Sequence, residues 1–307
     1  MNFQIGTDED IKEYYQFCLH HAHSLSRALP DELWHYTDAT GLIGILQSKQ
    51  IWSTQISCLN DASEQRHFGD LVHAKVKERR RDNKDPLLEP LFRVADEALR
   101  SREFTAVGQF VACFSEARDD LGQWRGYGGG ECGYAIGFSS NGILSAISPR
   151  VNTLLMPMIY ADSVHNFVAS DVIRMGEVYY RQGLCRGNPD LWTQEFVTAF
   201  GDVLSLTAAN VKHPKFSGEA ERRIVTMLQP GEQKKLEFRQ KRTMLARHLP
   251  ISLVVEEDGA CHLPITRIVV GPGPAQRVSK VSVGELLVKF DYQHIPVELS
   301  EVPYRQP

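Results

Sequence analysis

One short apolar run limits what this chain can fold into. Residues Phe110-Val-Ala-Cys-Phe-Ser115 form a continuous apolar segment of strand length. Such a run is typical of a strand that is buried on both faces of a sheet. The chain must therefore supply structure on both sides of this strand, and the sequence predicts a mixed helix-and-strand protein.

A strand, a capped helix and a second strand are predicted near the N-terminus. Residues 33–37, Leu-Trp-His-Tyr-Thr, are bulky and β-prone, and Ile51–Thr54 follows as a strand after the helix. Asp38 or Thr40 can cap that helix, whose apolar face is formed by Leu42, Ile45 and Leu46. Because backbone N–H groups at a helix N-terminus can receive an anion, this unit is a plausible place to hold a nucleotide.

Helical segments interrupt the predicted strands. We expect an N-terminal helix within residues 1–30 and a single α+β domain over residues 31–307, with helical insertions at about 61–103 and 163–211. The amphipathic spacing within these segments supports the helices. Further strands are predicted at Asn152–Tyr160, Ile251–Glu256, Leu263–Val270 and Ile295–Val302, and a short helix at Val281–Phe290.

Composition restricts the possible partners. A net charge of -4 gives no global attraction for polyanions. The basic runs Lys75–Arg81 and Lys234–Arg242 are interpreted as solvated helix faces. The six cysteines show no C-x-x-C pair and no zinc-like spacing, so we expect free thiols in a reducing compartment and no metal. No basic-apolar leader and no long apolar run is present, which predicts a cytoplasmic protein without a membrane partner.

Familiar catalytic motifs are absent or fail in context. The chain has no Walker A loop, no H-E-x-x-H, no G-x-S-x-G and no EF-hand loop. Gly128–Gly133 formally fits G-x-G-x-x-G, but the strand-like Tyr134–Phe138 follows it where the dinucleotide fingerprint requires a helix. We therefore interpret these glycines as a flexible loop.

A pair of glutamates is the remaining unusual feature. In a strand, Glu219, Glu221 and Arg223 would share one face. Two carboxylates on a strand that enters the core are costly unless they are used or paired. The sequence supports equally a catalytic pair and an edge strand with cross-strand Glu-Arg pairs.

Several motifs together resemble a large bacterial family of unknown function, over most of the chain from Leu33 to Val270. They are His35-Tyr-Thr, Gly41-Leu-Ile-Gly-Ile-Leu, Leu59-Asn-Asp-x-x-Glu64, Cys113-Phe-Ser-Glu116, Gln123-Trp-Arg-x-Tyr-Gly128, Gly133-Tyr-Ala-Ile-Gly-Phe138 and Glu219-x-Glu-x-Arg223. That family in turn resembles the ADP-ribosyltransferase-like fold of toxin and abortive-infection proteins. The resemblance implies an α+β fold with a mixed, largely antiparallel split β-sheet core and helical insertions.

The same resemblance implies roles for individual residues. Glu221 is similar to the catalytic glutamate, Glu219 to a preceding carboxylate that engages the acceptor, and Arg125 would suit a phosphate of NAD. NAD would be bound as a substrate by residues at strand ends and on strands: His35, Tyr36, Thr37, Ser115 and Tyr134. Within this group, His35 would hold a ribose and Tyr134 would stack.

Three functions follow as hypotheses. The first is an NAD-dependent ADP-ribosyltransferase that modifies a nucleic acid or protein acceptor, as a toxin or anti-phage effector would. The second is an NAD glycohydrolase with water as the acceptor. The third is a non-catalytic nucleotide- or nucleic-acid-binding sensor in which the glutamate pair is only salt-bridged. The transferase hypothesis expects His35, Tyr134 and Glu221 to line one cleft.

Overall fold

A computed structural model describes residues 9–24, 28–59, 63–101, 108–128, 133–150, 152–185, 188–228, 231–241, 244–257 and 259–303. The α-helices are α1 (Glu9–Ser24), α2 (Ala39–Ser48), α3 (Ser63–Asp82), α4 (Glu89–Ser101), α5 (Leu121–Tyr127), α6 (Ser140–Ile147), α7 (Asp162–Leu184), α8 (Pro189–Ala209) and α9 (Gln276–Lys289). The 3-10 helices are η1 (Ile56–Cys58), η2 (Pro86–Leu88), η3 (Pro214–Glu219) and η4 (Gln233–Lys235). The strands are β1 (Glu32–Thr37), β2 (Gln50–Gln55), β3 (Gln109–Ser115), β4 (Tyr134–Ser139), β5 (Thr153–Pro157), β6 (Glu221–Met227), β7 (Glu237–Lys241), β8 (Met244–Ser252), β9 (Val255–Glu257), β10 (Ala260–His262), β11 (Ile265–Val270) and β12 (Val297–Leu299).

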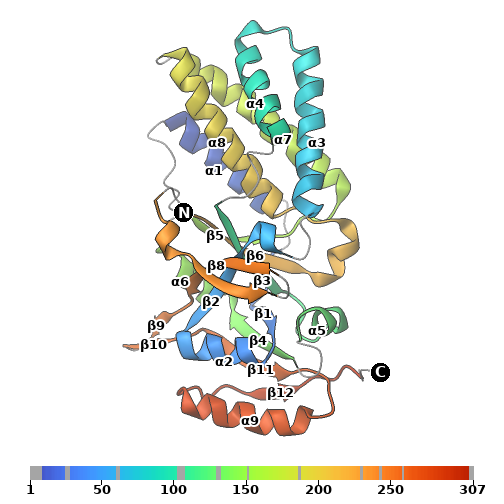
Figure 1. Cartoon of the computed structure of the whole chain (residues 1–307), viewed down its shortest axis with the longest axis vertical. Coiled ribbons are helices and arrows are strands. Elements are labelled where there is room, and N and C mark those ends of the chain that lie inside the picture. The colour runs from blue at the N-terminus through green and yellow to red at the C-terminus, as the bar shows by residue number, and fades with distance from the viewer. Residues whose placement is uncertain are drawn as a thin grey trace.

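The α+β fold class is confirmed. In Figure 1 a bundle of α1, α3, α4, α7 and α8 lies above the sheet, α2 lies in front of its lower strands, and α9 lies below β12. The sheet runs in the order β12-β11-β4-β1-β3-β2-β8-β7, while β6 pairs with both β3 and β5. Within the described residues, β11 and β12 pair in parallel and the other strand pairs are antiparallel.

The sheet branches at β3. One edge of β3 pairs with β6 along its whole length, from Gln109 to Ser115. The opposite edge is shared, because β2 pairs at Phe110 and Val111 whereas β1 pairs at Ser115. We call the stretch of that edge between the two partners, residues 112–114, the fork.

Apolar side chains on both faces explain why β3 is interior. Phe110, Ala112 and Phe114 pack into the lower core, which the sheet forms with α2 and α9, whereas Val111 joins the upper core of the helix bundle. This confirms the strand that the apolar run predicts. The bundle itself buries the aromatic side chains of α1, α7 and α8, which are Tyr14, Tyr180, Trp192, Phe196 and Phe200.

Several local predictions are confirmed. Asp38 caps α2, since its carboxylate accepts the backbone N–H of Gly41 at 2.8 Å. Pro189–Ala209 forms α8 with the predicted bounds, and its N-cap is Asn188. Residues 60–62, which include Asn60 and Asp61 of the Leu59-Asn-Asp-x-x-Glu64 motif, and residues 129–132, most of the predicted glycine loop, lie outside the described residues.

Other local predictions are wrong. Residues 234–241 are not a helix face, because they form η4 and the edge strand β7. The strand expected at Ile251–Glu256 is instead β8, which ends at Ser252, and β9 follows separately. Charged residues at high density suggest helix, but pairing of β7 with β8 along Glu237–Lys241 overrides that local tendency.

Candidate functional site

His35 lies at the fork. Its Nδ1 is 2.9 Å from the backbone carbonyl oxygen of Cys113, on the stretch of β3 that neither β1 nor β2 reaches. Burial lowers the pKa of His35, the hydrogen bond with Cys113 opposes this effect, and the positive charge of Arg239 adds to it. The imidazole is therefore neutral near neutral pH, and it replaces a missing strand neighbour at this carbonyl.

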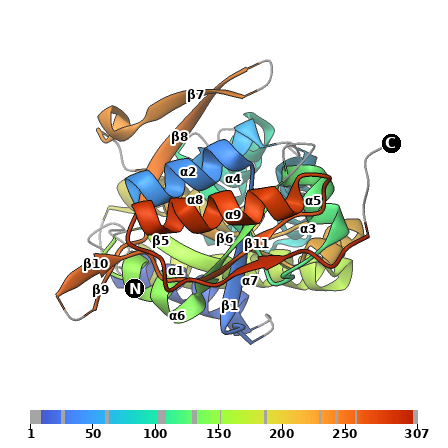
Figure 2. The same ribbon diagram turned by 90° about the horizontal axis from the view of Figure 1, so that it is seen from below.

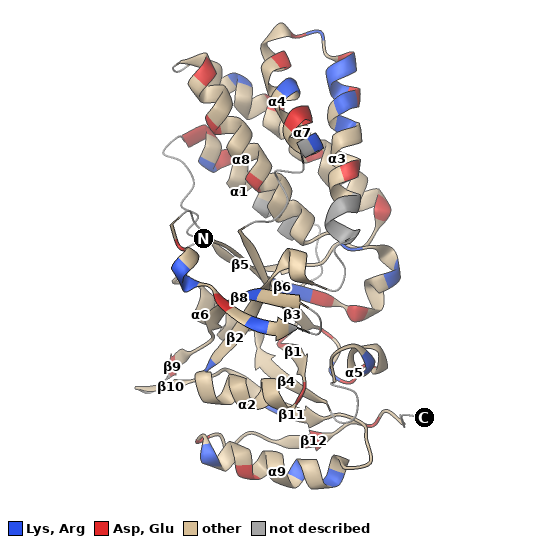
Figure 3. Cartoon of the chain, in the orientation of Figure 1, with Lys and Arg blue, Asp and Glu red and all other residues tan. Residues whose placement is uncertain are grey.

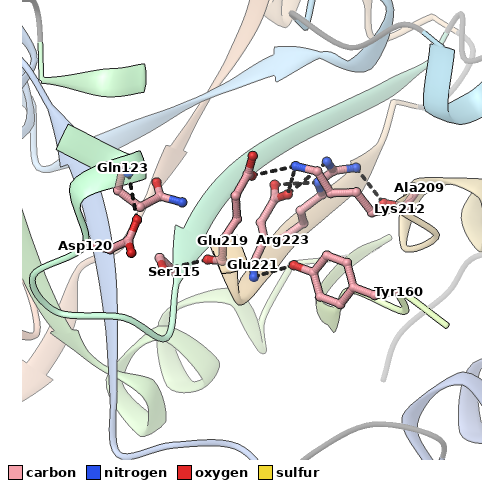
Figure 4. A network of polar contacts seen from close by, with 9 residues as sticks. All are labelled: Ser115, Asp120, Gln123, Tyr160, Ala209, Lys212, Glu219, Glu221 and Arg223. Atoms are coloured by element: carbon pink, nitrogen blue, oxygen red, sulfur yellow. Dashed lines mark hydrogen bonds and ion pairs between the residues drawn. The ribbon is translucent and has the colours of Figure 1, made fainter. Parts of the chain in front are cut away.

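Glu221 forms the centre of a buried ionic network at the start of β6 (Figure 4). Lys212 Nζ donates to Glu221 Oε2 at 2.7 Å and to Glu219 Oε2 at 2.6 Å. Arg223 donates through Nε to Glu221 Oε1 at 2.7 Å and through Nη2 to Oε2 at 3.1 Å. Figure 3 shows acidic and basic residues side by side at the start of β6.

The network keeps Glu221 ionised. Burial alone would raise the pKa of this carboxyl group, but the charges of Arg223 and Lys212 outweigh it and hold the pKa at about 2. Burial also opposes protonation of Lys212, and the carboxylate of Glu221 reverses this effect, so that the pKa of Lys212 is raised. The Glu221 side chain is only 6% exposed, against 26% for Glu219. Glu219 is thus the carboxylate that solvent reaches.

A strained corner separates the two glutamates. Ala220 has a φ of 43° and a ψ of 50°, a left-handed conformation that costs a residue other than glycine about 1–2 kcal/mol. Ser115 fastens this corner, because its hydroxyl donates to the Glu219 carbonyl oxygen at 2.7 Å. The backbone N–H of Glu116 donates to the Ala220 carbonyl oxygen at 2.8 Å. Strained backbone is concentrated at functional sites in proteins, so this corner indicates a candidate functional site.

The corner corrects the predicted arrangement of the acidic pair. Glu219 ends η3 and does not belong to a strand, and β6 begins only at Glu221. Glu221 and Arg223 do share a face, as the period of two predicts. The edge-strand alternative is wrong, because β6 lies between β3 and β5, and Arg223 pairs with Glu221 along the same strand.

Side chains from other elements surround the network. The Cys113 thiol hydrogen-bonds to the Glu221 carboxylate, and the Tyr160 hydroxyl accepts the Glu221 backbone N–H at 2.7 Å. Tyr127, at the end of α5, is 43% exposed. Burial of its hydroxyl, with the charges of Cys113, Glu219 and Glu221, raises the pKa of Tyr127. Tyr127 and Glu219 are therefore the parts of this site that face solvent.

The structure does not bring His35 and Tyr134 to Glu221. Pairing aligns Trp34 with Ser115 and Ser115 with Glu221, which places these side chains on one face of the sheet. His35 is one residue further along β1 and lies on the opposite face, where it contacts the ring of Phe114. Tyr134 lies on β4 and pairs with Thr37 of β1. Its side chain packs into the lower core, on the same face of the sheet as His35.

Other predicted site residues have structural partners. The Tyr36 hydroxyl donates to the Ala117 carbonyl oxygen at 2.7 Å and accepts the Asp120 backbone N–H at 3.1 Å, which holds the segment that leads into α5. Thr37 occupies the space that a side chain at Gly41 would fill. Arg125 is exposed on α5.

Sequence patterns miss Lys212, Tyr127 and Tyr160. Lys212 follows α8 as a single basic residue, and nothing in its neighbourhood indicates that its ammonium group is buried between two carboxylates. Tyr160 follows β5, and Tyr127 belongs to the Trp-Arg-x-Tyr cluster noted in the sequence. The signal in the sequence that indicates a buried cation is a buried strand that begins with glutamate, because such a charge requires a cationic partner.

These observations define an α+β protein with a branched sheet and a buried, ionised carboxylate next to a half-exposed one. The profile of a family described as a protein of unknown function (DUF2971) matches residues 123–224. That stretch begins in α5 and ends in β6, so it contains Tyr127, Lys212, Glu219 and Glu221. No curated protein and no solved structure matches the chain.

Among the described residues, no group of three or more His, Cys, Asp or Glu side chains could hold a metal ion. Within the same residues, no helix is both long enough and apolar enough to span a membrane.

Proposed function

We propose that this protein transfers ADP-ribose from NAD to a macromolecular acceptor, with Glu221 as the charge-stabilising carboxylate. The observation that carries the proposal is a carboxylate that two cations hold ionised in a buried site, with the half-exposed Glu219 two residues before it. The resemblance of the acidic motif to the ADP-ribosyltransferase-like fold supports the assignment of NAD.

The chemistry needs such a pair. When the bond between the ribose C1′ and the nicotinamide nitrogen breaks, its electron pair leaves with neutral nicotinamide, and positive charge develops on the ribose. An ionised carboxylate beside that carbon stabilises the charge, as in glycoside hydrolysis. Glu219 lies nearer solvent, where an acceptor arrives, and can accept the proton of the attacking group.

The residues that lie beside Glu221 are not the same set as those that the sequence predicts to bind NAD. Ser115, Cys113 and Tyr127 lie on the Glu221 side of the sheet, whereas His35 and Tyr134 lie on the other. We therefore do not propose that His35 and Tyr134 bind the nucleotide that reacts at Glu221. The described cysteines are free thiols, which suits a reducing compartment such as the cytoplasm.

A non-catalytic binding module is the second candidate, and one observation favours it. Both oxygens of Glu221 already accept hydrogen bonds from Arg223 or Lys212. A network that is complete in this way also serves as a structural ion cluster. In this second function, the branched sheet would bind nucleotide or nucleic acid without turnover.

One measurement distinguishes the two candidate functions. The full chain is incubated with NAD together with cell extract, single-stranded DNA, RNA or no acceptor, and both nicotinamide release and mass addition are followed. We expect release by the wild type and none by Glu221→Gln. Release without any labelled acceptor would identify a glycohydrolase, and absence of release under every condition would leave only the binding module.

A second variant separates transfer from bond cleavage. Because Glu219 is half-exposed, Glu219→Gln should fold, and we expect it to lose labelling of the acceptor while it still releases nicotinamide. Equal loss of both activities would show that Glu219 does not act on the acceptor.

A further inference from the structure

Trp52 is an exposed aromatic ring in an interior strand. It lies on β2, which is bounded by β3 and β8, yet 42% of its surface is exposed. The other tryptophans, Trp34, Trp124 and Trp192, are buried at 2%, 4% and 6% exposure. An indole with this exposure is available to a planar binding partner.

A half-buried guanidinium group lies over this ring. The Cζ atom of Arg239, on β7, is 5.2 Å from the Trp52 ring centroid, and Nη2 donates to the Thr54 hydroxyl at 2.7 Å. Burial lowers the pKa of Arg239, and the negative charge of Asp38 opposes this effect. The buried Nε of Arg239 has no hydrogen-bond partner among the described residues. A half-buried guanidinium in this state is suited to bind an anion with two parallel hydrogen bonds.

A buried histidine completes the cluster. The His248 ring centroid lies 4.6 Å from that of Trp52, and its side chain is 2% exposed. Its Nδ1 has no hydrogen-bond partner within the described part of the chain, and Nε2 lies 3.4 Å from Glu237 Oε2. We call Trp52, Thr54, Arg239 and His248 the tryptophan platform. Three buried nitrogens in it, Arg239 Nε and both ring nitrogens of His248, have no hydrogen-bond partner among the described residues, which is unusual in a protein core.

The platform stands on a projecting, basic part of the molecule. Figure 2 shows that β7 and β8 extend away from the body. Lys234 and Lys235 are exposed in η4, immediately before β7, and Arg247 lies on β8. Strand alternation places Arg247 and Phe238 on the opposite face of this hairpin from Arg239 and His248.

We propose that the tryptophan platform binds single-stranded nucleic acid, with a base stacked on Trp52 and an adjacent phosphate on Arg239. That this strand is the acceptor of ADP-ribose rests on the proposed function, whereas the binding itself does not.

The chemistry of the platform selects this ligand class. Stacking on an exposed aromatic ring needs a base that is free of its complementary strand, so a duplex does not fit. A phosphate beside each base supplies an anion that Arg239 can bind, and the lysines of η4 can follow the backbone of a longer strand. An acidic peptide would satisfy the guanidinium but would leave the indole face without a planar partner.

Intrinsic fluorescence measures this binding directly. Because the remaining tryptophans are buried, stacking of a base should quench mainly Trp52. The full chain, without NAD, is titrated with a single strand of about a dozen nucleotides, within the range of known site sizes. The duplex of the same sequence, AMP and an acidic peptide are titrated in parallel. We expect quenching by the single strand alone, and Trp52→Phe should remove most of the quenching.

Matched variants locate the site on one face of the hairpin. In anisotropy titrations with a labelled single strand, we expect Trp52→Ala to weaken binding at least about fivefold, the lower end of what one stacked base contributes. Arg239→Gln should also weaken binding and reduce its salt dependence by about one phosphate contact. Phe238→Ala and Arg247→Gln, on the opposite face, should bind as the wild type does.

Two outcomes overturn the single-strand site. Equal losses on both faces would show nonspecific attraction to a basic hairpin, and equal binding of duplex, AMP or peptide would exclude a single-strand site. If single strands bind at the platform but no nicotinamide is released from NAD, only the proposed transferase fails. If release occurs and acceptor labelling survives Trp52→Ala and Arg239→Gln, the strand bound at the platform is not the acceptor.

Discussion

At the scale of single residues, the ionic network sets how the protein responds to acid. The folded-state pKa of Glu221 is about 2, below the value of 4.5 for the free group. A depressed pKa stabilises the fold above the unfolded value, and this contribution disappears as the pH falls from there through about 2. The shift corresponds to about 3 kcal/mol at neutral pH.

We expect Glu221→Gln to destabilise the chain by about 3–5 kcal/mol, because Lys212 and Arg223 would remain buried without their anion. Urea unfolding at several pH values measures this, and the difference from the wild type should shrink below about pH 4.5. Adding Lys212→Met should recover part of the loss, since it removes one of the unpaired charges. A variant as stable as the wild type would show that the network does not hold the fold.

Ala220 supplies a second prediction at the same scale. Glycine adopts its left-handed conformation without a steric cost, so Ala220→Gly should raise the free energy of unfolding by up to about 1 kcal/mol. Asn152→Gly is the matched control, because asparagine tolerates its φ of 59° better than alanine would. Thermal melts of both variants measure the difference. A smaller gain at Ala220 than at Asn152 would argue against strain at the corner.

At the scale of elements, close approach of α7 and α8 depends on Gly183. A Cβ atom at this position would lie 2.0 Å from the ring of Trp192. Gly183→Ala should therefore separate the two helices and cost about 1–3 kcal/mol. Gly69→Ala, in open space on α3, should instead stabilise by up to about 1 kcal/mol through helix propensity. Calorimetric melts of the two variants distinguish the packing effect from helix propensity. Similar melting temperatures of the two variants would contradict the expected separation of α7 and α8.

Elements with a clear local signal could be predicted from the sequence. The apolar run at β3, the Asp38 cap of α2 and the amphipathic helix α8 all follow from residues close in the chain. β8 could not be predicted in this way, because its strand conformation depends on pairing with β2 and β7. Sequence reasoning likewise found Glu219 and Glu221, but the partner Lys212 is brought to them only by tertiary packing.

At the scale of the whole molecule, β3 and its neighbours join the two cores. The upper core contains Val111 and Val225 from the strands, and the lower core contains Phe114 and Ile224 from the same two strands. Loss of packing in the helix bundle must therefore reach the sheet, and we expect the chain to unfold in one cooperative transition.

Phe196→Ala tests this coupling. The side chain is fully buried in α8, so the substitution should cost about 3–5 kcal/mol. Circular dichroism in the far ultraviolet reports mainly the helices. In a Trp192→Phe background, which removes the tryptophan that packs against Phe196, the near-ultraviolet signals of Trp34 and Trp124 report the sheet side. Both should shift to the same lower urea midpoint. Separate midpoints would show that the bundle and the sheet are independent domains.

The branching of the sheet also has a consequence for synthesis. The partners of β3 are Trp34 on β1, Thr54 and Gln55 on β2, and the whole of β6, which a ribosome makes long after β3 itself. Until β6 emerges, the nascent chain carries an apolar strand with an open edge, the feature that invites aggregation. Completion of the sheet must wait for these distant segments, which slows folding. This protein should consequently depend on chaperones while it is being translated.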